Sequence, residues 1–226
     1  MREIVLDTET TGLDPLTGDR VVEIGCVELI NHISTSQFFH VYLNPERDMP
    51  SEAAMVHGLT DEFLADKPVF AEKVDEFLNF IGDSQLVIHN AAFDMNFINA
   101  ELTRCGYRRL PADRAVDTVL MARKMFPGAP ASLDALCKRF GVDASSRKLH
   151  GALLDAQLLA EVYLELRGGR QPDLDMSTSS VASTSEDTVQ AVRIHREPRP
   201  HSATADELAA HEAFMSQIKD PLWKRA

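Results

Sequence analysis

Residues 4–12 of the chain read Ile4-Val5-Leu6-Asp7-Thr8-Glu9-Thr10-Thr11-Gly12. The apolar run 4–6 is short and continuous, which is typical of a central strand covered on both faces. Two acids follow it at positions 7 and 9, and strand side chains two residues apart point to the same face. Neighbouring carboxylates resist ionising together unless a cation lies between them. The stretch therefore predicts a buried strand whose end carries either a metal site or two solvated acids.

Two later segments of the chain also end in an acid. Asp94 follows a strand-like run at 86–88 and lies where a helix is expected to start, so it is a candidate metal ligand or a helix cap. His150 and Asp155 are five residues apart, and five helical steps rotate by about 140°, so they cannot share one helix face. We expect Asp155 on a helix and His150 on the lead-in beside Gly151, although a lone surface histidine is the competing interpretation.

The composition is that of an ordinary globular protein. The 226 residues are 44% hydrophobic and 26% charged, which suits one sizeable domain with appendages. We expect neither a signal peptide nor a bilayer-spanning segment. Three widely separated cysteines predict neither a disulfide framework nor a zinc site and favour a cytoplasmic location. The net charge of −12 opposes tight binding of nucleic acid by this chain alone, unless bound cations or a partner compensate.

The pattern of apolar residues indicates an α/β fold. Strands are expected at 4–6, 21–30, 38–43 and 86–88, with a polar turn at 31–37, and helices at 70–81, 95–102, 133–140 and 153–166. Three early strands followed by strands that alternate with helices predict a mixed β-sheet of about five strands, flanked by α-helices.

Three regions are expected along the chain. They are a globular domain at 1–170, a flexible linker at 171–203 and a C-terminal helix at 204–226. Thr204 and Glu207 match the capping box that opens a helix, and Pro221 is expected to end it. A lone helix cannot build its own core, so an apolar stripe with a terminal tryptophan favours a partner-binding role. The expected contact residues are Leu208, Met215, Ile218, Leu222 and Trp223.

The three acidic segments resemble the motifs of the DEDDh 3′–5′ exonucleases, within the ribonuclease H-like superfamily. Asp7 and Glu9 match the first motif, Asp94 the second, and His150 with Asp155 the third, His-x-x-x-x-Asp. The likeness covers about residues 2–169 and is strongest to members that proofread for bacterial replicative polymerases. It implies a ribonuclease H-like fold and an enzyme that removes mispaired 3′-terminal nucleotides during DNA replication.

The resemblance also implies a mechanism with two divalent metal ions, Mg²⁺ or Mn²⁺. Asp7 would bridge the ions, and Glu9 and Asp155 would complete the nucleophile-side ion. Asp94 would serve the leaving-group side, through water if not directly. His150 would be the general base that activates the attacking water, since imidazole can accept a proton near neutral pH.

Substrate contacts are implied at the same end of the domain. The residues concerned are Asp7, Glu9, Thr10, Glu52, His57 and Asp155. For His57, a packed histidine beside a turn glycine is the alternative, and His89 is expected to be structural. A set of basic residues is a candidate for the phosphate backbone, although most of them are expected to form a solvated face: Arg104, Arg108, Arg109, Lys138, Arg139, Arg147 and Lys148.

Partners are expected from the linker and the tail. Gln171, Leu174 and Met176 resemble a degenerate sliding-clamp motif, with an ordinary linker as the alternative. By resemblance the C-terminal helix binds the catalytic subunit of a replicative DNA polymerase. A small theta-like accessory subunit is a further partner, without a separate signature. The expected substrate is a single-stranded or frayed 3′ DNA end.

Two other functions compete with proofreading. The first is a freestanding DEDDh exonuclease that acts on RNA ends or short oligonucleotides, and the long linker with its capped tail opposes it. The second is a non-catalytic tether between clamp and polymerase. The complete set of four acids and one histidine opposes a tether, because an adaptor has no physical need for them.

Overall fold

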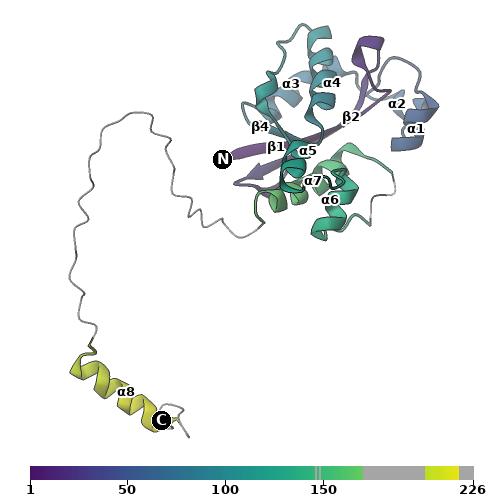
Figure 1. The fold of residues 1–226 in the computed structure, drawn as a ribbon. Coiled ribbons are helices and arrows are strands. Elements are labelled where there is room, and N and C mark those ends of the chain that lie inside the picture. The colour runs from purple at the N-terminus through teal and green to yellow at the C-terminus, as the bar shows by residue number, and fades with distance from the viewer. Residues whose placement is uncertain (146, 148, 170–201, 219–226) are drawn as a thin grey trace, which may run out of the picture. The chain divides into compact units, whose positions relative to one another are not determined.

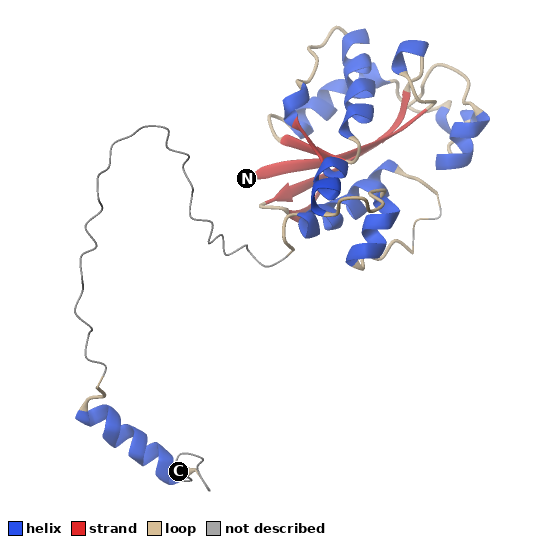
Figure 2. Cartoon of the chain, viewed as in Figure 1, coloured by secondary structure: helices blue, strands red, loops and turns tan. Residues whose placement is uncertain are grey.

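The structure is a computed structural model that describes residues 1–145, 147, 149–169 and 202–218. Residues 1–169 contain a five-stranded sheet with the order β3-β2-β1-β4-β5 (Figure 2). The strands are β1 (Arg2–Thr10), β2 (Val21–Ile30), β3 (Ile33–Tyr42), β4 (Gln85–Ile88) and β5 (Ala115–Asp117). The pairs β1–β2 and β2–β3 are antiparallel, whereas β1–β4 and β4–β5 are parallel. The predicted mixed sheet is therefore confirmed.

Helices cover both faces of the sheet (Figure 1). On one face lie α3 (Phe70–Ile81) and α4 (Ala91–Arg104), and on the other lie α5 (Thr118–Met125), α6 (Leu133–Phe140) and α7 (Ala152–Leu166). Shorter elements are η1 (Pro15–Thr17), α1 (Ser51–His57), α2 (Asp61–Leu64) and η2 (Ala112–Arg114). Within the described parts of the chain, none of the helices combines the length and apolarity that crossing a bilayer requires.

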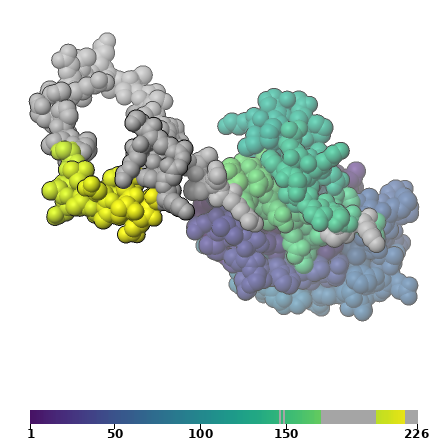
Figure 3. Space-filling model, turned by 90° about the horizontal axis from the view of Figure 1, so that it is seen from below, coloured from purple at the N-terminus to yellow at the C-terminus, as the bar shows by residue number. Residues whose placement is uncertain are grey.

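The alternation of side chains along β1 decides which layer each residue meets. Ile4 and Leu6 are buried with α3 and α4, whereas Val5 is buried with α6 and α7. The same alternation directs Asp7 and Glu9 toward the α7 layer. In the space-filling view of Figure 3, α7 (green) lies between the helices at 118–140 (teal) and the N-terminal strands (purple).

Gly25 of β2 lets α7 approach the sheet closely. It pairs with Asp7 across the β1–β2 ladder. A Cβ atom at position 25 would lie 2.3 Å from the carbonyl carbon of Ala152 and from the amide nitrogen of Leu153. Only glycine leaves room for this backbone contact. The contact places the first turn of α7, with Asp155, next to Asp7.

The hairpin between β2 and β3 corrects one expectation. The turn is only Asn31-His32, both with positive φ (51° and 67°), as a tight two-residue hairpin requires. β3 therefore begins at Ile33 rather than at Phe38. Its first polar residues were mistaken for a turn because β3 is an edge strand and exposed there.

The helical expectations were accurate where a glycine ends the helix. α3 and α6 have the predicted bounds, and Gly82 and Gly141 follow them. The helix expected at 95–102 instead begins at Ala91. The short elements α1, α2, β5 and α5 were not predicted, because each has too few residues to show a clear hydrophobic period.

Residues 202–218 form a separate part that contains α8 (Ala205–Gln217). The predicted capping box of Thr204 and Glu207 is present. The predicted end at Pro221 was wrong, since the helix stops at Gln217 and Ile218 is extended. Helices tend to stop before the residue that precedes a proline, because that residue disfavours the α conformation. Outside the described residues lie Gln171, Leu174, Met176, Leu222, Trp223 and all of the expected linker except 202–203.

Candidate active site

Asp94 comes to the site from α4, on the opposite face of the sheet from α7. It is the fourth residue of that helix and is 3% exposed. The N-cap is Asn90, so the alternative interpretation of Asp94 as a helix cap is wrong. Instead, the Oγ1 hydroxyl of Thr8 donates a hydrogen bond of 2.7 Å to Asp94 Oδ1. Thr8, between the two acids of β1, thus fixes the acid of α4 beside them.

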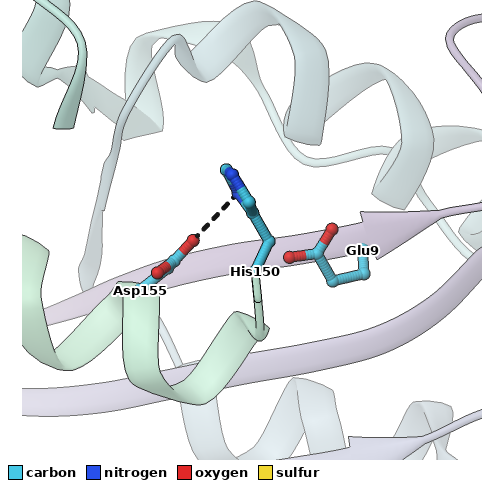
Figure 4. Close-up of side chains that lie close together, drawn as sticks. All are labelled: Glu9, His150 and Asp155. Atoms are coloured by element: carbon cyan, nitrogen blue, oxygen red, sulfur yellow. Dashed lines mark ion pairs between the residues drawn. The ribbon is translucent and has the colours of Figure 1, made fainter. Parts of the chain in front are cut away.

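His150 and Asp155 lie as their spacing predicted. Asp155 is buried in the first turn of α7, and His150 lies on the lead-in, two residues before the helix. The distance between His150 Nδ1 and Asp155 Oδ2 is 3.4 Å. Figure 4 shows the His150 side chain between those of Asp155 and Glu9, and ligand atoms of all three lie within 4.8 Å of one another.

The protonation of the acids shows that they share one poorly solvated region. Burial raises the pKa of Asp7 well above its ordinary value, and the charges of Asp94, Glu9 and Asp155 raise it further. Burial likewise raises the pKa of Glu9 to about 8 and that of Asp94 to about 7. Such acids favour a cation among them. The oxygen-rich donor set therefore fits hard divalent metal ions.

Arg147 is the site residue that the sequence placed wrongly. It was a candidate for the phosphate backbone or a solvated face, yet its side chain is only 8% exposed. Its Nε and Nη2 atoms donate to the two oxygens of Asp155 at 2.6 and 2.7 Å. Nothing in the local pattern distinguishes Arg147 from the other basic residues, because its partners come from other elements.

The other basic candidates mostly have local partners or face solvent. Arg104 pairs with Glu101, and Arg139 lies over the ring of Phe126 at 4.4 Å. Arg108, Arg109 and Lys138 are exposed, and Lys148 lies outside the described residues.

His57 is buried at the C-terminal end of α1, as the packed-histidine alternative expects, but one of its nitrogens is unsatisfied. The Leu59 amide donates a 3.0 Å hydrogen bond to Nδ1, so the neutral ring carries its proton on Nε2. Among the described residues no acceptor meets full hydrogen-bond geometry at Nε2, although the Thr10 backbone lies close to the ring. Burial lowers the pKa of this imidazole. The unsatisfied N–H suits a ligand that accepts a hydrogen bond.

The remaining substrate candidates differ in exposure. Thr10 is buried and its hydroxyl donates to the carbonyl oxygen of Gly12 at 2.6 Å. Glu52 is exposed in the first turn of α1.

Two further polar pairs lie near the acids. Glu23 lies opposite Glu9 in the β1–β2 register, is buried, and contacts His40 Nε2 at 2.8 Å. Only the pairing of β1 with β2 identifies Glu23 as a neighbour of Glu9. His89 contacts the hydroxyl of Thr118 at 2.9 Å, in keeping with the structural role expected of it.

Asp117 holds the start of α4, where the cap residue Asn90 makes no side-chain hydrogen bond. Its Oδ2 accepts the Ala91 amide at 3.1 Å, while its Oδ1 accepts the Val119 amide of its own helix at 2.8 Å. One carboxylate thereby ties α4 to α5 and steadies the turn that carries Asp94.

The raised pKa values predict how stability depends on pH without metal. The pKa of Glu9 rises from 4.5 to about 8, so between these values the folded chain holds a proton that the unfolded chain has released. Stability must then fall as pH rises through this window. From about pH 5.5 to pH 8 we expect a loss of at least about 1 kcal/mol, or roughly 2–4 °C in Tm.

Thermal melts in a chelating buffer measure this loss. The Glu9→Gln variant is the matched control and should show a shallower decline. Added Mg²⁺ should stabilise the wild type most at the higher pH. A metal-free Tm that is flat or rising over this window would contradict the raised pKa of Glu9.

Comparisons with known proteins show which family this chain resembles. A family model described as Exonuclease matches residues 4–163. A relative from Rickettsia felis called DNA polymerase III subunit epsilon is 52% identical over 222 residues, covering 96% of this chain and 97% of the relative. A relative of the same name from Escherichia coli K12 is 47% identical over 228 residues, covering 96% and 93%. The solved structure of exonuclease X in complex with 5′ overhanging duplex DNA aligns with a TM-score of 0.57 at 26% identity, covering 73% of this chain and 90% of that one.

Proposed function

Because this chain belongs to the exonuclease family, we propose that it removes mispaired nucleotides from 3′ DNA ends as the proofreading subunit of a bacterial replicative polymerase. Membership of this family makes the chain a phosphodiester hydrolase of the 3′–5′ type that uses divalent metal ions. The name shared by its relatives, over nearly their full length, supports the replicative role.

We assign the metal ligands to the four converging acids, Asp7, Glu9, Asp94 and Asp155. Two Mg²⁺ or Mn²⁺ ions, when bound, would supply the positive charge that stabilises the attacking and leaving oxygens of the displacement. The observation that carries this assignment is geometric. Ligand atoms of Glu9 and Asp155 lie within 4.8 Å of each other and of His150, Thr8 holds Asp94 against β1, and Gly25 lets the first turn of α7 approach Asp7. Bound cations would offset the repulsion among these acids.

We assign the general base to His150. It is half exposed at the mouth of the cluster, where water can reach the ring, and it lies on a lead-in next to Gly151. The unsatisfied Nε2–H of His57 is suited to a substrate oxygen, and Thr10 and Glu52 would flank the terminal nucleotide.

Mispaired ends are selected by fraying in this proposal. A site built from buried acids needs an unpaired 3′ end, and unpairing costs least at a mismatch. No residue therefore has to recognise the mispair.

Association with the polymerase supplies the affinity that the acidic chain lacks. The capped helix α8 is our candidate for binding the catalytic subunit, and Leu208 on it is exposed. A tether raises the local concentration of the nuclease at the primer end. Clamp binding through Gln171, Leu174 and Met176, and a theta-like accessory subunit, remain further proposals.

Removing residues 172–226 separates the proofreader from its rivals. Residues 1–169 contain the two largest buried apolar clusters and all five site residues, so nuclease activity on single-stranded DNA should change less than about twofold. Polymerase association, measured by co-elution with the purified catalytic subunit, should be lost. A full-length variant with Thr204 and Glu207 both changed to alanine is a finer control. It lacks the capping box of α8, and losing this cap costs about 1 kcal/mol of helix stability.

Either of two results would contradict the proposal. A truncated chain that still co-elutes with the polymerase would show that α8 is not needed for binding the catalytic subunit. A full chain that never associates, yet degrades short RNA as fast as DNA, would favour the freestanding nuclease.

A further inference from the structure

Arg147 links three parts of the active site through one buried guanidinium group. Besides its two bonds to Asp155, it donates from Nη1 to Asp134 in the first turn of α6. Its Nη2 also lies 2.9 Å from His150 Nδ1. The same Nδ1 lies 3.4 Å from Asp155 Oδ2, so His150 is packed against both members of the Arg147–Asp155 pair. The arginine thus contacts a candidate metal ligand and the candidate base together.

The bidentate pair leaves Asp155 able to bind a cation. A carboxylate offers about four lone-pair positions, and a bidentate arginine takes two of them. With Arg147 in place, an oxygen of Asp155 still lies within 4.8 Å of ligand atoms of Glu9 and His150. Arginine and metal ion can therefore share this carboxylate.

We propose that Arg147 is a positioning residue that fixes the Asp155 carboxylate for metal binding and holds the His150 ring beside it. The proposal rests on the proposed function of the four acids as metal ligands. The two hydrogen bonds from the forked Arg147 guanidinium fix the plane of the Asp155 carboxylate, and the hydrogen bond to Asp134 holds the guanidinium against α6. Groups that orient a metal ligand are commonly worth about 10–100-fold in metal affinity.

Two other roles for Arg147 make different predictions. If the guanidinium competed with metal for Asp155, its removal would tighten metal binding. If it contacted the phosphate backbone, its removal would raise KM for DNA and leave metal affinity unchanged. The buried position of the side chain and the continued convergence of Glu9, His150 and Asp155 favour the positioning role.

Mn²⁺ titration of the full chain by calorimetry tests the proposal without any nuclease assay. Arg147→Lys keeps the charge but loses the fork, and Arg147→Gln loses both. We expect Mn²⁺ affinity to fall by about 10-fold or more in both variants, and kcat on a single-stranded oligonucleotide to fall with KM nearly unchanged. Arg123→Lys, at an exposed arginine in the last turn of α5, is the matched control and should behave as wild type.

The Lys variant carries the test if the Gln variant does not fold, because it keeps a cation beside the buried Asp155. Unchanged Mn²⁺ affinity in the folded Lys variant would overturn the proposal, even if its Tm is lower. Tighter binding would overturn it in favour of competition. Failure of the proposed function would look different, since the wild type itself would then bind no Mn²⁺ at the acids or release no nucleotides.

Discussion

Replacing Asp7 with asparagine is expected to lower Mg²⁺-dependent release of nucleotides from single-stranded DNA by about a thousandfold or more. Burial raises the pKa of Asp7, and the charges of Asp94, Glu9 and Asp155 raise it further, so Asp7 lies near all three of the other acids. Metal ions stabilise such displacements by several kcal/mol, and about 4 kcal/mol corresponds to a thousandfold. Initial rates on a labelled oligonucleotide give the measurement.

The same substitution should stabilise the chain when metal is absent. It removes one of the mutually repelling acids, so the metal-free Tm should rise while added Mg²⁺ stabilises the variant less than the wild type. Asp66→Asn is the matched control, because Asp66 is exposed and pairs only with the adjacent Lys67. An Asp7→Asn enzyme that retains more than a tenth of wild-type activity would remove Asp7 from the metal site.

Replacing His150 with alanine should lower kcat by about 10²–10⁴-fold, the usual contribution of a general base. Mn²⁺ affinity should stay largely intact, because the four acids remain in place. In contrast, Asp155→Asn should lower both kcat and the affinity for Mn²⁺. His211→Ala changes an exposed histidine of α8 and should leave the activity on single-stranded DNA unaltered.

A parallel loss of Mn²⁺ affinity and turnover in His150→Ala would contradict the assignment. Ligand atoms of Glu9, His150 and Asp155 lie close enough for one ion to contact all three. The titration therefore decides between a histidine that accepts a proton and a histidine that binds metal.

The sequence predicted those elements whose local pattern is complete. α3 has apolar residues on one face and ends at Gly82, so both of its bounds were correct. β3 was placed five residues late, because its exposed residues are polar and a two-residue turn leaves little signal. The capped start of α8 was correct and its end was not, since a proline marks where a helix cannot continue rather than where it stops.

The acids Asp7, Glu9, Asp94 and Asp155, together with His150, could be identified from sequence because each lies in a short motif with its own spacing. Their convergence could not, since it depends on pairs far apart in the chain. Gly25 admits α7 to the sheet beside Asp7, and Thr8 binds Asp94 from across a separation of 86 residues. Arg147 lies in no motif. Its side chain is buried against Asp155 because α6 packs against α7, which the sequence around Arg147 does not indicate. Periodicity and spacing are local properties of the chain, whereas a shared electrostatic site is a property of the fold.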